Sequence, residues 1–185
     1  MPRRPHDFYE TPPHYVDALV RAFPELKSSL NLIFEPCVGK GAISDNFANT
    51  LTNDIDPKRQ ADYRMDATDG KVWRVARAYA RREQQFLYVV TNPPFNQAAD
   101  ILRQALKECP GVMIAMLLRL SFLEPTKARR DLLERHPPSS IIVLPRYSFR
   151  LNDKGERATD NVTCAWMVWN REAMPRIRID GNKLA

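Results

Sequence analysis

Long hydrophobic runs are missing from this sequence. The longest apolar stretch, Val112 to Leu118, is far below the roughly 20 residues that a membrane-spanning helix needs, so it predicts a buried strand. Arg3 and Arg4 are followed by no apolar segment, which predicts that a secretory signal is absent. We therefore expect no membrane partner and a cytoplasmic location.

Cysteine and histidine are also scarce. The three cysteines, Cys37, Cys109 and Cys164, are odd in number and show no CxxC spacing. The three histidines form no ligand pattern with them. Disulfide frameworks and structural zinc sites both depend on such patterns. We therefore expect neither disulfides nor a bound metal.

The length, composition and charge of the chain suit one globular domain with an anionic partner. The chain has 185 residues, 44% of them hydrophobic and 27% charged, which is enough to bury one core but hardly a second. We therefore expect a single domain over residues 1–185. The 28 lysines and arginines outnumber the 22 acidic residues, giving a net charge of +6. This balance favours a polyanion such as nucleic acid, although many basic proteins bind none.

Strand-like and helix-like segments alternate along the chain, as is typical of an α/β fold with a parallel sheet. Apolar runs predict strands at 32–35, 51–54, 63–65, 86–91, 112–118, 140–144 and 164–169. Spacing or composition predicts helices at 16–23, 42–49, 71–82, 98–109 and 127–135. A polar loop joins the last two strands, so we expect them to pair antiparallel. The predicted fold is a doubly wound, seven-stranded, mostly parallel sheet with one antiparallel strand.

Two motifs follow the first two predicted strands, at the sheet edge where ligands bind in open α/β folds. The first strand runs into Glu35-Pro36-Cys37-Val38-Gly39-Lys40-Gly41, whose glycines permit a tight turn close to a ligand. The second ends in Asp54-Ile55-Asp56-Pro57, where an acid can bind ribose hydroxyls. Each motif alone also occurs in ordinary turns. Together, on neighbouring strand ends, they predict a nucleotide-type cofactor.

The most specific motif is Asn92-Pro93-Pro94-Phe95, directly after the strand at 86–91. Two prolines fix their φ angles and lack N–H donors, so the carbonyls beside them can face a site. An asparagine oxygen and a proline carbonyl then make two acceptors on a rigid frame, which suits the NH2 group of an aromatic ring. Phe95 adds a stacking face for that ring. The alternative is a proline-rich turn with a core phenylalanine.

These motifs resemble those of a known family. The segment from Glu35 to Gly41 is similar to the glycine-rich motif of class I S-adenosylmethionine-dependent methyltransferases, and Asn92-Pro93-Pro94-Phe95 is similar to the catalytic motif of amino-methyltransferases. Their order, with Phe8-Tyr9-Glu10-Thr11-Pro12-Pro13 ahead of the glycines, resembles small DNA adenine methyltransferases encoded by phages and prophages. Segments 118–124, 145–149 and 165–169 extend the likeness over almost the whole chain.

The resemblance implies a Rossmann-like class I fold and S-adenosylmethionine as the cofactor. The residues implied to bind the cofactor are Tyr9, Thr11, Pro12, Glu35, Pro36, Cys37, Gly39, Gly41, Asp54, Ile55, Asp66, Ala67 and Asn92. Among these, Gly39 and Gly41 would pass the methionine part, and Glu35 would lie near its amino group. Tyr9 and Thr11 would close the pocket from the N-terminal side.

The same resemblance implies how the adenosine half is held. Asp54 would bind the ribose hydroxyls, and Ile55 would pack on the adenine ring. Asp66 would accept from the adenine amino group, whereas its simpler alternative is a turn or N-cap residue.

For catalysis, the resemblance implies that Asn92, Pro93, Pro94 and Phe95 act on a base flipped out of the DNA. The implied substrate-binding residues are Phe95, Phe149, Tyr147, Arg119 and Arg146. Phe149, or else Tyr147, would face Phe95 across the base, and the arginines would neutralise phosphates. The chain leaves no room for a separate target-recognition domain. Loops at 122–127 and 151–160 would therefore read the DNA with short or relaxed specificity.

We expect the target to be N6 of adenine in double-stranded DNA, methylated by a monomer or homodimer in a bacterial host cytoplasm. The catalytic motif also occurs in enzymes that methylate N4 of cytosine, adenine in RNA, or the glutamine side chain of proteins. The basic balance disfavours a protein substrate. A partner subunit that keeps the fold without catalysis is the non-enzymatic alternative, and the intact motif at 92–95 argues against it.

Overall fold

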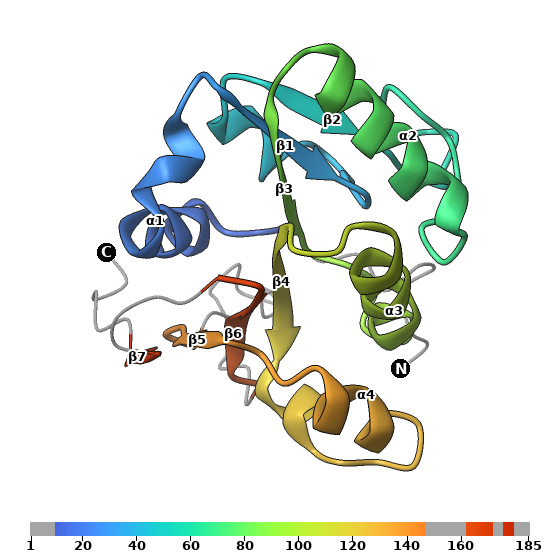
Figure 1. Ribbon diagram of the computed structural model, residues 1–185. Helices are drawn as coiled ribbons and strands as arrows, with labels where there is room; N and C mark the ends of the chain where they lie inside the picture. The colour runs from blue at the N-terminus through green and yellow to red at the C-terminus, as the bar shows by residue number, and fades with distance from the viewer. Residues whose placement is uncertain (1–9, 147–161, 172–175, 180–185) are drawn as a thin grey trace.

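The computed structural model describes residues 10–146, 162–171 and 176–179. Its helices are α1 (Pro13–Ala22), α2 (Gly70–Arg82), α3 (Ala98–Glu108) and α4 (Arg130–Arg135), with short 3₁₀ helices η2 (Pro24–Lys27), η3 (Ser44–Asn46) and η4 (Leu120–Leu123). Its strands are β1 (Asn31–Glu35), β2 (Thr50–Thr52), β3 (Phe86–Thr91), β4 (Met113–Arg119), β5 (Ser140–Val143), β6 (Cys164–Trp169) and β7 (Ile177–Ile179). Figure 1 shows their arrangement.

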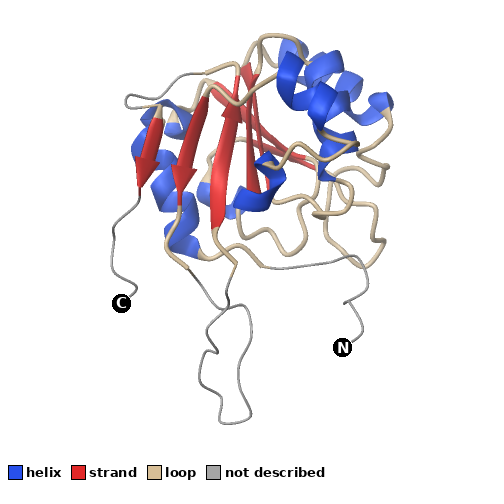
Figure 2. Cartoon of the chain, turned by 90° about the horizontal axis from the view of Figure 1, so that it is seen from below, coloured by secondary structure: helices blue, strands red, loops and turns tan. Residues whose placement is uncertain are grey.

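The described strands form one sheet in the order β2-β1-β3-β4-β6-β5-β7. Strand β6 is antiparallel to both β4 and β5, whereas every other neighbouring pair is parallel. Consecutive strands such as β5 and β6 can pair antiparallel without a crossover helix, which explains the reversal. The predicted class, a single α/β domain with a mostly parallel seven-stranded sheet and one antiparallel strand, is confirmed (Figure 2).

Both faces of the central strands are buried, and this explains their almost continuous apolar sequences. Alternate residues of a strand point to opposite faces. Phe34 of β1 and Met116 of β4 belong to a core shared with α2 and α3. Ile33 and Leu117, one position away on the same strands, belong to a second core shared with α1. Figure 1 shows α1 and the α2–α3 pair on the two sides of the sheet.

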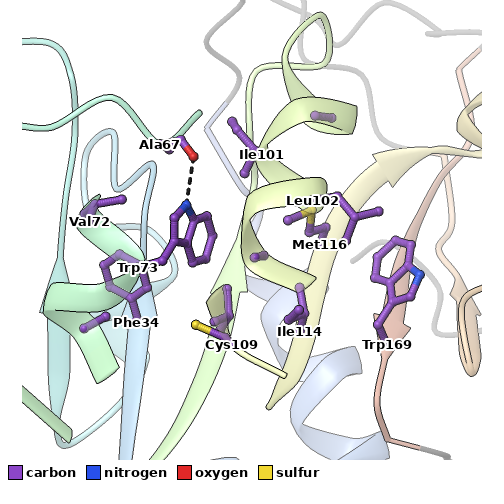
Figure 3. Close-up of a cluster of buried hydrophobic side chains, with 14 of the residues drawn as sticks. Phe34, Ala67, Val72, Trp73, Ile101, Leu102, Cys109, Ile114, Met116 and Trp169 are labelled. Carbon is purple, nitrogen blue, oxygen red and sulfur yellow. Dashed lines mark hydrogen bonds between the residues drawn. The ribbon is translucent and has the colours of Figure 1, made fainter. Parts of the chain in front are cut away.

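Trp73 lies at the centre of the core beneath α2 (Figure 3). Helix α2 begins at an N-cap, Asp69, whose side chain accepts from the Lys71 N–H, and this start directs Trp73 toward the sheet. The buried indole meets the Phe34 ring edge-on, with 5.4 Å between centroids. Its Nε1 donates to the Ala67 carbonyl at 2.9 Å. The core therefore also anchors the loop that precedes α2.

The predicted helix at 42–49 is wrong, since only η3 forms there. Side chains, one of them on β1, take the backbone groups that a helix would use. The Asn46 amide donates to the Ala42 carbonyl at 2.9 Å, and the Ser44 N–H donates to the Glu35 carboxylate at 2.8 Å. The glycine-rich segment is therefore followed by a compact turn.

The strand predicted at 63–65 is also wrong. Tyr63 makes a single bridge to Asn53, and the Asn53 side chain then bonds the N–H and the carbonyl of Met65, each at 2.9 Å. These two side-chain hydrogen bonds stand where a strand would have a second pair of backbone hydrogen bonds. The seventh strand is instead β7, whose three residues are too few to give a periodic signal in the sequence.

Within the described ranges, no helix combines the length and the apolar character that crossing a membrane requires.

Candidate functional site

Four neighbouring parallel strands, β2, β1, β3 and β4, have their carboxyl ends at one edge of the sheet. Strand β1 lies between β2 and β3, and β3 lies beside β4. After β1 the chain forms β2 on one side of β1, and it later forms β3 on the opposite side of β1. The carboxyl ends of β1 and β3 therefore flank a topological switch point, where open α/β sheets bind ligands. The glycine-rich segment follows β1 there, and Asn92 follows β3.

The glycine-rich segment turns through two left-handed residues. The backbone φ is +58° at Gly39 and +86° at Gly41, values that favour glycine. A Cβ on Gly41 would meet Oδ1 of Asp45 at 2.9 Å, so a side chain there would displace Asp45. The Gly39 N–H donates to Oδ2 of Asp54 at 2.8 Å. This bond holds the turn against the end of the neighbouring strand.

Asp54 therefore has a structural contact that its sequence motif did not predict. Its second oxygen, Oδ1, accepts from the Asp56 N–H at 2.9 Å. A carboxylate oxygen has two lone pairs, so each oxygen of Asp54 retains capacity for a ligand hydroxyl. Ile55 follows with 56% of its surface exposed. The Asp54 carboxylate can accept from the hydroxyls of a ribose, and the exposed Ile55 side chain can pack on the ring of a base. The pair therefore fits a nucleoside.

Glu35 is 1% exposed, and its Oε2 accepts from the Ser44 N–H at 2.8 Å. Burial raises the pKa of this carboxyl well above its usual range, although the bonds to Ser44 act in the opposite direction. A cationic group beside Glu35 would restore the carboxylate. The ammonium of a methionine moiety is such a group.

Cys37 lies in the same segment, between Glu35 and Gly39. Burial raises the pKa of its thiol, and the charge of Asp54 raises it further. Cys37 is therefore a neutral thiol near pH 7. A neutral thiol is a weaker nucleophile than a thiolate.

Asp66 and Ala67 lie in the turn before α2. Oδ1 of Asp66 accepts from the N–H of Thr68 at 2.8 Å and from its hydroxyl at 2.7 Å. The N-cap of α2 is Asp69, three residues later. Asp66 therefore supports the turn itself, while its contact with a cofactor stays a prediction. Ala67 is buried and is held in place by Trp73.

The N-terminal segment lies against both motifs. Glu10 and Lys40 form an exposed ion pair at 3.1 Å, which links this segment to the glycine-rich turn. Thr11 is 5% exposed and accepts a hydrogen bond from Nδ2 of Asn92 at 3.1 Å. Pro12, also buried, is the N-cap of α1. Residues 10–12 thus connect the two sequence motifs in space.

The proline pair leads from β3 into α3. Pro93 is buried, and the Pro94 carbonyl accepts from the Gln97 N–H at 3.0 Å, which closes the turn before the helix. Phe95 is half-buried and packs against the α2–α3 core. The guanidinium carbon of Arg119, at the end of β4, lies over the Phe95 ring, 4.6 Å from its centroid. A cation therefore covers one face of this aromatic ring.

The structure describes two of the predicted substrate-binding arginines, Arg119 and Arg146, in different surroundings. Arg119 is partly buried beside Phe95, and its Nε has no hydrogen-bond partner within the described part of the chain. Arg146 is exposed just after β5. Three predicted residues, Tyr9, Tyr147 and Phe149, lie outside the described residues, as does the loop at 151–160. In the described ranges, no group of three or more metal-binding side chains is placed to hold a metal.

Sequence reasoning missed three contacts that build this site: Asp54 with Gly39, Thr11 with Asn92, and Arg119 with Phe95. The predicted order of motifs could have suggested the first, because neighbouring strand ends meet at one edge. The other two join residues whose proximity has no signal in local spacing.

Comparisons with solved structures find folds of this type. A modification subunit of a proposed type I restriction enzyme from Vibrio vulnificus YJ016 aligns with a TM-score of 0.54 and 11% identity, covering 94% of this chain and 46% of that chain. A chain from a type I restriction–modification system aligns with a TM-score of 0.51 and 14% identity, covering 96% and 44%. A proposed class I S-adenosylmethionine-dependent methyltransferase from Listeria monocytogenes aligns with a TM-score of 0.47 and 10% identity, covering 89% and 61%.

The chain thus spans less than half the length of the two restriction–modification chains. No family model and no curated protein sequence matches it. At these identities the likeness shows the fold alone. That fold is an α/β domain built on one mostly parallel sheet, which this chain shares with parts of the two restriction–modification chains.

Replacement of Asp54 tests the cofactor pocket. Asp54→Ala removes an acceptor for ribose and also releases the Gly39 N–H, so S-adenosylmethionine should bind more weakly by about 1 to 3 kcal/mol. Titration calorimetry measures this change. Asp56→Ala is the matched control, because Asp56 pairs with Arg59 and does not contact the glycine-rich turn. Equal affinities for the parent and Asp54→Ala would show that the cofactor does not bind here.

Proposed function

We propose that this protein transfers a methyl group from S-adenosylmethionine to an exocyclic amino group, with N6 of adenine in DNA as the target. The observation that carries this proposal is the position of Asn92. It follows β3 at the switch point of the α/β sheet, beside the glycine-rich turn, and its amide is bonded to the buried Thr11. The amide is thus held by a hydrogen bond at a strand end of the kind where open α/β sheets bind ligands.

The residues at the end of β1 fit the proposed cofactor. Glu35 is a buried carboxyl suited to an ammonium group, and Gly39 and Gly41 let the backbone approach a ligand. Asp54 and the exposed Ile55 suit a ribose and a purine face, respectively. When bound, S-adenosylmethionine supplies an electrophilic methyl group on a sulfonium.

The protein's part in the reaction is to prepare the amine. An exocyclic NH2 on an aromatic ring is a poor nucleophile because its lone pair is delocalised into the ring. Oδ1 of Asn92 and the carbonyl of Pro93 accept its two hydrogens, which raises the electron density on nitrogen and aligns it for attack. Phe95, at the end of the motif, supplies an aromatic ring on which the base can stack.

Two observations support DNA as the substrate. The net charge of +6 favours a polyanion, and two solved structures of similar fold come from type I restriction–modification systems. The other amine substrates, N4 of cytosine, adenine in RNA and protein glutamine, present the same planar NH2 group. They are therefore separate outcomes of the experiment.

The test is a methyl-transfer assay with labelled S-adenosylmethionine. Separate incubations contain double-stranded DNA, single-stranded DNA, RNA and protein extract. We expect label in double-stranded DNA, recovered as N6-methyladenine on nucleoside analysis. An excess of S-adenosylhomocysteine, the demethylated product, should suppress the transfer and serves as the control.

Other products would change the proposal in defined ways. N4-methylcytosine, labelled RNA or methylglutamine would replace the target and leave the reaction in place. Absence of transfer to all four substrates, from folded protein that binds NAD more tightly than S-adenosylmethionine, would overturn the proposal as a whole.

A further inference from the structure

Thr11 and Asn92 meet at the switch point although 81 positions separate them in the sequence. Nδ2 of Asn92 donates to Oγ1 of Thr11 at 3.1 Å. Thr11 is only 5% exposed, so water cannot easily replace its hydroxyl as the acceptor. The contact therefore constrains the asparagine amide in a way that solvent would not.

We propose that Thr11 is a positioning residue for methyl transfer, and that it acts by fixing the orientation of the Asn92 amide. The inference rests on the proposed function. An amide has a donor end and an acceptor end, and a rotation of 180° about the last side-chain bond exchanges them. Only the acceptor end can receive a hydrogen from the substrate NH2. In this structure the Thr11 hydroxyl accepts from Nδ2, so one amide hydrogen is directed at Thr11 and the carbonyl end of Asn92 points away from it.

The rest of the fold holds Thr11 in place. Pro12 is the N-cap of α1, and Tyr15 in the first turn of this helix is 1% exposed. The Tyr15 hydroxyl donates to the Pro145 carbonyl at 2.8 Å, and Nε1 of Trp166 on β6 donates to the Tyr15 carbonyl at 2.6 Å. Helix α1 is therefore fastened to the sheet within four residues of Thr11. Such support from a packed element is what a precise site requires.

Thr11→Val removes the hydroxyl and keeps the shape of the side chain. We expect kcat to fall on the order of ten- to a hundredfold, the range typical of a misplaced catalytic group, while the Kd for S-adenosylmethionine stays at the parent value. Thr11→Ser keeps the hydroxyl and should restore most of the rate. Thr50→Val, a half-buried threonine on β2, controls for the exchange of hydroxyl for methyl. A weaker cofactor Kd with unchanged kcat would overturn the inference and make Thr11 part of the cofactor pocket.

A double-mutant cycle tests whether Thr11 acts through Asn92. In an Asn92→Ala background the amide is gone, so Thr11→Val should produce no further loss of kcat. If the two losses instead multiply, Thr11 acts elsewhere and the inference fails. A merely structural threonine would give this second result.

A readout without substrate separates the inference from the proposed function. In the free protein, NMR should show one Asn92 side-chain amide proton protected from exchange, with protection lost in Thr11→Val and kept in Thr11→Ser. Unchanged protection in Thr11→Val would overturn the inference whatever the enzyme methylates. Normal NMR behaviour, with no methyl transfer by the parent protein, would instead locate the failure in the proposed function.

Discussion

Asn92→Ala should lower the rate of methyl transfer on the order of a hundred- to a thousandfold, or about 2.7 to 4 kcal/mol, as loss of one preorganised polar group does in other enzymes. The substitution removes the acceptor for the substrate amine and leaves β3 and both prolines unchanged. Although the resemblance also places Asn92 among the cofactor-binding residues, cofactor affinity should fall far less than the rate, because the other residues of that set are unchanged. Single-turnover kinetics with labelled cofactor measure the rate, and calorimetry measures the affinity.

Asn96→Ala is the matched control for this experiment. Asn96 is an exposed amide one residue beyond Phe95, so its removal should leave the rate at the parent value. Asn92→Ala also deprives the buried Thr11 hydroxyl of its partner, which should cost about 1 kcal/mol of unfolding free energy. A folded Asn92→Ala protein that methylates at the parent rate would return the motif to its alternative, a proline-rich turn.

Trp73→Ala should lower the free energy of unfolding by about 3 to 5 kcal/mol, the usual cost of removing a large aromatic from a core. The indole is fully buried, packs edge-on against Phe34 and bonds the Ala67 carbonyl. Its loss would leave a cavity between α2 and the sheet. Urea unfolding followed by circular dichroism measures the change.

Two further variants separate the sources of that loss. Trp73→Phe keeps an aromatic ring but leaves the Ala67 carbonyl without its donor, so it should cost about 1 to 3 kcal/mol. Arg81→Ala, on the exposed side of α2, should stay within about 0.5 kcal/mol of the parent. If Trp73→Ala were as stable as Arg81→Ala, α2 would not be packed on the sheet as described.

The apolar pattern predicted some elements closely and others not at all. Strands β3 and β6 begin and end where the sequence predicts, because each is an almost continuous apolar run; β6 is buried throughout, and β3 is buried over its second half. The segment at 42–49 has the composition of a helix but forms only η3. There the competing bonds of Asn46 and Ser44 decide the conformation, and one of them comes from Glu35 on β1. The residue pattern within 42–49 carries no information about a hydrogen-bond partner on another element.

The sequence by itself determined the α/β class, the reversed strand and the identity of the chemical motifs, because these follow from periodicity, loop length and residue type. Only the tertiary structure decided how the motifs are held. It set Asp54 against Gly39, Arg119 over Phe95 and the amide of Asn92 against Thr11. The physical reason is that these contacts depend on which strands are neighbours and on where α1 packs. Burial of both sheet faces fixes these features for the chain as a whole, and no local segment encodes them.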